Sequence, residues 1–132
     1  MAGVMNSRIR ARDILPRMTD HYLHNPRCSK SRAALEIVRE ASVDVPVREY
    51  LREPLSVDEL RAIVAMLGVR PIEIVRRGEA QYAALGLSEA TPDDEVLRAM
   101  AEHPLLIERP IVVRGGRAVV GRPPELVREI LT

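Results

Sequence analysis

The hydrophobic pattern of the first third of the chain changes period twice. Tyr22 and Leu23 close a short apolar stretch that we interpret as a strand, and Pro26 then interrupts it. Four apolar residues follow at helical spacing, at Ala34, Leu35, Val38 and Ala41. Residues 45–51 alternate moderately, which indicates a second strand. The order strand, helix, strand is typical of a βαβ unit.

The middle of the chain reads as a block of helices. Ser56 and Glu59 form a capping-box pattern, which predicts a helix that ends at Gly68. Pro71 suits the first turn of another short helix, and a further turn or two is expected from Glu79 to Leu85. Thr91 is expected as an N-cap, with a helix running from Pro92 to about residue 103.

The C-terminal part returns to a β pattern. Residues 111–113 and 118–120 are apolar and flank Gly115-Gly116, which predicts two strands joined by a tight hairpin. Pro123 and Pro124 end the second strand, and residues 125–131 are expected to form a closing helix.

Together these elements predict the mixed α/β class. A βαβ unit followed by a ββα unit is the plan of the thioredoxin-like fold, here with a helical subdomain inserted at about residues 54–104. Residues 18–132 are then one domain. We expect residues 1–17, which carry four arginines, to be an extension outside it.

Composition narrows the function classes. The 132 residues suffice for one domain with one core, and a net charge of +1 gives no general attraction to nucleic acid. No apolar run approaches the roughly 18 residues that a membrane span needs. One cysteine cannot form an internal disulfide, so we expect a reducing compartment, the cytoplasm.

That cysteine, Cys28, lies between the first predicted strand and the first helix. Backbone amides at a helix N-terminus favour a thiolate, and Arg27, Lys30 and Arg32 add positive charge. The alternative without a catalytic role is a buried structural cysteine, but the surrounding segment is almost wholly polar. A reactive thiol with a lowered pKa is therefore the favoured interpretation.

Four segments of the chain are similar to those of a known family. They are HNPRCSKSR at 24–32, RRGEAQY at 76–82, HPLLIERPIVV at 103–113 and GRP at 121–123. In this order they resemble the glutaredoxin-coupled arsenate reductases, over the chain from about Met18 to the C-terminus. One departure is Ser-Lys-Ser after the cysteine, where plasmid-type members carry Gly-Thr-Ser, so this chain resembles a chromosomal subgroup.

The resemblance implies an oxidoreductase that converts arsenate to arsenite. Cys28 is then the nucleophile, and Arg76, Arg109 and Arg122 match the family's anion-binding arginines, of which the first also steadies the thiolate. Glutathione, as co-substrate, displaces an arsenic-bound oxygen, and glutaredoxin completes the reduction. No bound cofactor or metal is implied. Guanidinium groups suit this role because they bind tetrahedral oxyanions through paired hydrogen bonds.

The resemblance also implies residues that adjust the thiol. His24 matches a histidine that influences the cysteine, and Ser31 matches a hydroxyl that hydrogen-bonds its sulfur. In the family the bond before the residue matching Pro110 is cis, which brings Arg109 beside Cys28.

Each of these residues has a plainer interpretation. Arg109 and Arg122 precede prolines and could be arginines at strand edges. Arg77 could take the place of Arg76. His24 could be a structural histidine, and serines near a helix start are often caps. His21, His24 and Cys28 lack the fourth ligand of a zinc site.

Two other functions remain open. A redox regulator of this fold usually carries Cys-x-x-Cys, whereas Ser31 occupies the second position here. A general glutathione-linked thiol protein has no need of oxyanion arginines.

Overall fold

The computed structural model describes residues 19–131 and contains a mixed four-stranded sheet with the strand order β2-β1-β3-β4. β1 pairs in parallel with β2 and antiparallel with β3, and β3 pairs antiparallel with β4. The strands are β1 (His21–His24), β2 (Val47–Glu49), β3 (Ile111–Arg114) and β4 (Arg117–Val120). This is the thioredoxin-like α/β arrangement predicted from the order of the elements.

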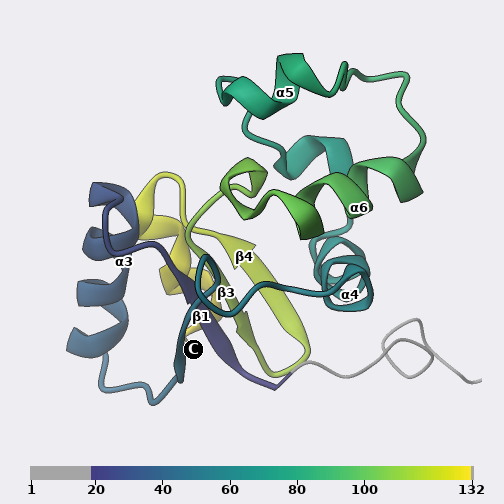
Figure 1. Cartoon of the computed structure of the whole chain (residues 1–132). Helices are drawn as coiled ribbons and strands as arrows, with labels where there is room; N and C mark the ends of the chain where they lie inside the picture. Colours follow the sequence, from purple (N-terminus) through teal and green to yellow (C-terminus); the bar gives the residue numbers. More distant parts are fainter. Residues whose placement is uncertain (1–18, 132) are drawn as a thin grey trace, which may run out of the picture.

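Helices cover both faces of the sheet (Figure 1). They are α3 (Ser29–Glu40), α4 (Val57–Leu67), α5 (Ala80–Ala84), α6 (Asp93–Glu102) and three 3₁₀ helices, η1 (Pro71–Ile74), η2 (Pro104–Leu106) and η3 (Pro124–Ile130). α3 packs with η3 on one face, and α4 and α6 lie together on the other. All helices between α4 and η2 come from the segment that joins β2 to β3.

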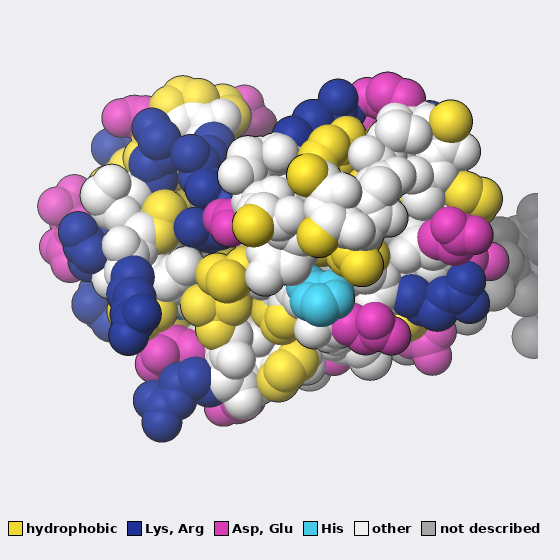
Figure 2. All heavy atoms as spheres, turned by 45° about the horizontal axis from the view of Figure 1, so that its top comes forward, with side chains coloured by type: hydrophobic (Ala, Val, Ile, Leu, Met, Phe, Trp, Pro, Cys, Tyr) yellow, Lys and Arg dark blue, Asp and Glu magenta, His cyan; other side chains and the backbone are white. Residues whose placement is uncertain are grey.

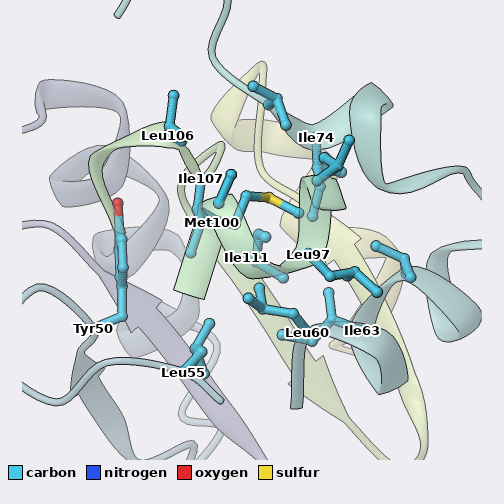
Figure 3. Packing of buried hydrophobic residues seen from close by; sticks show 14 of the residues in the cluster. Tyr50, Leu55, Leu60, Ile63, Ile74, Leu97, Met100, Leu106, Ile107 and Ile111 are labelled. Carbon is cyan, nitrogen blue, oxygen red and sulfur yellow. The ribbon is translucent and has the colours of Figure 1, made fainter. Parts of the chain in front are cut away.

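The alternation of side chains along the strands divides the core in two. Tyr22 and Val112 face α3 and η3, whereas Leu23, Ile111 and Val113 face the helices of the opposite side. The second cluster is aliphatic apart from Tyr50 and includes Leu60, Ile63, Leu97, Met100 and Leu106 (Figure 3). The chain lacks Phe and Trp, so these branched side chains fill the interior.

Several local predictions are confirmed. Ser56 and Glu59 form the capping box, and Gly68 closes α4 in the left-handed region at φ 70°. Gly115 and Gly116 both have positive φ in the turn between β3 and β4, where other residues would be strained.

Three details differ from the sequence-based expectation. The N-cap of α6 is Pro92, because the Thr91 hydroxyl already accepts a hydrogen bond from the Ser88 amide, 2.9 Å. The closing helix is 3₁₀ throughout. β2 is shorter than residues 45–51, because the Glu49 carbonyl accepts from the amides of Arg52 and Glu53 and turns the chain.

The strand directions bring four loops to one edge of the sheet. β1 and β2 are parallel and end there, the antiparallel β3 begins there, and β4 ends there. Within residues 19–131 there is no helix whose length and apolar character would let it cross a membrane. Residues 1–17 lie outside the described residues, so the expected N-terminal extension stays a prediction.

Candidate active site

Cys28 lies at this edge, as the N-cap residue of α3. Its backbone amide donates to the Asn25 carbonyl at 3.0 Å, and its own carbonyl accepts the first helical hydrogen bond from Arg32, also at 3.0 Å. The residue is partly exposed. A tight turn after β1 thus directs the thiol across the start of the helix, where backbone N–H groups are free to face it.

The pKa of the Cys28 thiol lies below its ordinary value. Burial of the sulfur raises the pKa, but the backbone N–H groups of Ser31 and Lys30 and the Arg109 guanidinium together outweigh that effect. Arg109 thus acts on the thiolate. The family resemblance gives such a role to Arg76, and that assignment stays a prediction.

Ser31 and His24 form the support beneath this turn. The Ser31 hydroxyl lies 2.7 Å from His24 Nδ1 and accepts a hydrogen bond from the Asn25 amide at 3.1 Å. Tyr22 donates to the Ser31 carbonyl. The resemblance implied a bond from the Ser31 hydroxyl to the sulfur. In the structure the hydroxyl is bonded to His24 and Asn25, and it is the Ser31 backbone amide that faces the sulfur.

Burial lowers the pKa of His24, and the charges of Arg39 and Arg32 act in the same direction against Glu49. A neutral imidazole and a serine hydroxyl can form a hydrogen bond although neither group is charged. This pair therefore holds the turn without adding charge next to the thiol.

A short antiparallel bridge brings Arg76 beside the segment that carries Arg109. Val75 pairs with Ile107, the Arg76 amide donates to the Leu106 carbonyl at 2.7 Å, and the Glu108 amide donates to the Ile74 carbonyl at 2.8 Å. Arg76 is thereby aligned with the segment that carries Arg109.

Arg109 and Arg122 each precede a cis proline, Pro110 and Pro123. They stand just before β3 and just after β4, outside the strands. Arg122 Nη1 donates to the Arg109 carbonyl at 3.1 Å, and the Gly121 amide donates to the Pro110 carbonyl at 2.9 Å. The cis bond at Pro110 agrees with the family pattern; the one at Pro123 was not expected from the sequence.

Two glutamates that the sequence analysis overlooked lie between the arginines. Glu79 contacts Arg76 at 3.4 Å and Arg109 at 3.9 Å, and Glu108 contacts Arg76 at 3.1 Å and Arg122 at 3.8 Å. Both belong to the motif segments RRGEAQY and HPLLIERPIVV, so their positions were visible while their contacts were not.

Tyr50 is a third unexpected residue of this region. It directly follows β2, is 1% exposed, and points its hydroxyl toward the segment of Leu106 (Figure 3). Burial raises the pKa of Tyr50 to about 12 even though the charge of Arg109 opposes the change. The hydroxyl has no hydrogen-bond partner among residues 19–131, nor does Arg109 Nε.

Two further arginines, Arg77 and Arg32, have partners outside this cluster. Arg77 is exposed and paired with Glu89, so the register that selects Arg76 agrees with the geometry. Arg32 donates to the Pro26 carbonyl at 2.9 Å. Figure 2 shows Lys and Arg side chains gathered on one side of the face above the sheet edge, with an acidic side chain at their border.

Residues 23–130, which include every segment of this site, match the ArsC family. The chain belongs to the ArsC family. It is 44% identical over 110 residues to a protein named arsenate reductase from Neisseria meningitidis, covering 82% of this chain and 94% of that protein. It is equally similar, 44% over 110 residues, to YfgD of Escherichia coli K12, 92% of which is covered.

Solved structures of ArsC-type proteins share the fold. The structure titled arsenate reductase from Vibrio cholerae superposes with a TM-score of 0.80 at 43% identity, covering 86% of this chain and 98% of that one. Cys28 and the arginine cluster thus lie on a fold that this chain shares with the solved relative over almost the whole length of the relative.

Proposed function

We propose that this chain is an arsenate reductase in which the Cys28 thiolate attacks arsenic. The observation that carries the proposal is the lowered pKa of Cys28, with the Arg109 guanidinium beside it, in a chain of the ArsC family. Relatives at 44% identity bear the name arsenate reductase. A thiolate next to a guanidinium combines a nucleophile with a donor for the oxygens of its target.

The first step forms a sulfur–arsenic bond. The Cys28 thiolate attacks arsenate, and one arsenic-bound oxygen leaves as water after taking up protons. Arg109 and Arg122 donate hydrogen bonds to the remaining oxygens as charge builds on them, and the N–H groups at the start of α3 face the sulfur.

Two external thiols then supply the two electrons. Glutathione displaces a second arsenic-bound oxygen as water and forms a second sulfur–arsenic bond. The glutaredoxin thiolate attacks the glutathione sulfur, so the electron pair of the broken bond stays on arsenic and reduces it to the trivalent state. A mixed disulfide leaves, and hydrolysis releases arsenite and Cys28. Because Cys28 is the chain's one cysteine, both thiols must come from other molecules.

The test is an NADPH-linked assay with arsenate, glutathione, glutaredoxin and glutathione reductase. We expect arsenate-dependent turnover that is abolished in Cys28→Ser and strongly reduced in Arg109→Ala. A parallel assay with thioredoxin and its reductase identifies the coupling thiol. Fast alkylation of Cys28 without arsenate-dependent turnover in either system would contradict the proposal and favour a general thiol protein.

Neighbouring arginines provide a matched control. Arg76 lies in the cluster with Glu79 and Glu108, whereas Arg77 is exposed and paired with Glu89. Arg76→Ala is therefore expected to raise the KM for arsenate, and Arg77→Ala to leave it near the wild-type value.

A further inference from the structure

Five charged side chains form one alternating network at the edge of the sheet. Read along their contacts, the order is Arg109, Glu79, Arg76, Glu108, Arg122. They come from the segment before α5, the segment before β3 and the residue pair after β4. Each guanidinium is thus already in contact with a carboxylate when no ligand is bound.

The charges of this network nearly cancel. Three guanidinium groups and two carboxylates leave a net charge of +1, and the Cys28 thiolate brings the sum to zero. The Glu79 and Glu108 side chains are only 25% and 29% exposed, so water and salt screen them less than an ion pair at the surface. An incoming anion therefore meets two fixed negative charges as well as the arginines.

The contacts differ in strength along the network. Arg76 lies within hydrogen-bonding distance of both glutamates, at 3.4 and 3.1 Å. The contacts of Arg109 with Glu79 and of Arg122 with Glu108 are longer, at 3.9 and 3.8 Å. The glutamates thus hold Arg76 most closely, whereas Arg109 and Arg122 also donate to backbone carbonyls, those of Leu105 at 3.4 Å and of Arg109 at 3.1 Å.

We propose that Glu79 and Glu108 set the charge specificity of this site by shifting its preference from doubly charged toward singly charged tetrahedral oxyanions. Without Glu79 and Glu108 the three arginines and the thiolate would sum to +2, which suits a doubly charged ligand, whereas the two carboxylates lower this sum to zero. Doubling the charge of the ligand doubles its attraction to the arginines and also its repulsion by the carboxylates, so the carboxylates reduce the advantage of a doubly charged ligand. The inference rests on the oxyanion site of the proposed function.

The test measures ligand charge preference without arsenate. Cys28 is alkylated with iodoacetamide, and protection is titrated with sulfate and with perrhenate, two tetrahedral anions of different charge, at constant ionic strength. The measured quantity is the ratio of the two half-protecting concentrations. Comparing this ratio between variants cancels the difference in hydration of the two anions.

Glu79→Gln and Glu108→Gln remove one negative charge each and keep an oxygen that accepts from arginine. We expect each to shift the ratio toward sulfate by about fivefold, and the double variant by more. Glu89→Gln, which alters the exposed pair with Arg77, is the matched control and is expected to leave the ratio unchanged.

Two results would overturn the inference. One is an unchanged ratio in both glutamine variants while the anions still protect. The other is equal loss of protection by both anions in variants with a native circular dichroism spectrum, which would make the glutamates mere supports for the arginines. In either case arsenate turnover by the wild type leaves the proposed function standing. If neither anion protected Cys28 in the wild type or in any variant, that result would contradict the oxyanion site itself.

Discussion

The Arg122 guanidinium donates a hydrogen bond of 3.1 Å to the backbone carbonyl of Arg109. Arg122, which follows β4, thereby fixes the backbone of Arg109, which precedes β3. Both arginines reach the same side of the sheet edge as Cys28. Arg122 thus combines a positive charge with a hydrogen bond that holds the backbone of Arg109.

Replacing Arg122 therefore has a larger effect than loss of one charge. We expect Arg122→Ala to raise the KM for arsenate by about tenfold or more. Arg117→Ala is the matched control, since Arg117 also donates to a backbone carbonyl, that of Glu129 at 3.0 Å, but on the exposed hairpin. Equal KM values for the two variants would show that Arg122 is not part of the site.

Cys28 reactivity is expected to depend on pH through Arg109. The rate of alkylation by iodoacetamide follows the thiolate fraction, and its midpoint in wild type lies below the ordinary cysteine pKa. Arg109→Ala removes a positive charge near the sulfur and is expected to raise that midpoint. An unchanged midpoint would assign the lowered pKa to the helix N-terminus alone.

The same shift has a consequence for stability. The folded-state pKa of Cys28 is depressed, so its ionisation stabilises the fold above the unfolded-state pKa and this contribution is lost as pH falls through the folded-state pKa. The difference in unfolding free energy between wild type and Cys28→Ser is therefore expected to increase from acidic to alkaline pH. Denaturant titrations across this range measure it, and a flat difference would contradict the shift.

The two buried tyrosines are expected to respond oppositely to loss of their hydroxyl groups. Tyr22 donates to the Ser31 carbonyl, so Tyr22→Phe is expected to lower the unfolding free energy by about 1–2 kcal/mol. Tyr50 has a buried hydroxyl with no partner among residues 19–131, so Tyr50→Phe is expected to leave stability unchanged or raise it. Thermal unfolding of both variants decides this, and a clear loss in Tyr50→Phe would indicate a hydrogen bond at that hydroxyl.

Ser31 is expected to matter for stability, whereas its neighbour Ser29 is not. The buried Ser31 hydroxyl satisfies both the Asn25 amide and His24, and Ser31→Ala leaves them unsatisfied at a cost of about 1–3 kcal/mol. Ser29 is exposed, and Ser29→Ala is expected to change stability by less than about 0.5 kcal/mol. Chemical denaturation gives both values, and similar losses in the two variants would refute the supporting role of Ser31.

Gly121 is expected to tolerate no side chain. A Cβ there would lie 2.8 Å from both Pro110 Cγ and Val127 Cγ1. Gly121→Ala must push the Pro110 ring away and displace Arg109 with it, so we expect a loss of about 1–3 kcal/mol together with reduced arsenate turnover. Gly78→Ala is the control, because open space surrounds that position. Full activity in Gly121→Ala would show that the Arg109 segment adapts.

Local sequence patterns determined most of the elements. The capping box of α4, the glycine that ends it and the two glycines of the hairpin depend on residues near one another in the chain, so they can be read directly. The first turn of α3 was predictable for the same reason, and with it the placement of Cys28 at a helix N-terminus. The order of the four motif segments in addition indicates the family from the sequence alone.

Tertiary structure alone decided what surrounds the thiol. Tyr50 reaches the site because β2 is parallel to β1 and ends at the same edge, and Glu108 meets Arg76 through the bridge between Val75 and Ile107. Arg76 and Glu108 form a 3.1 Å pair although they are 32 positions apart in the chain. Charge pairing acts through space, so the sequence specified three arginines, and folding decided that two carboxylates share them.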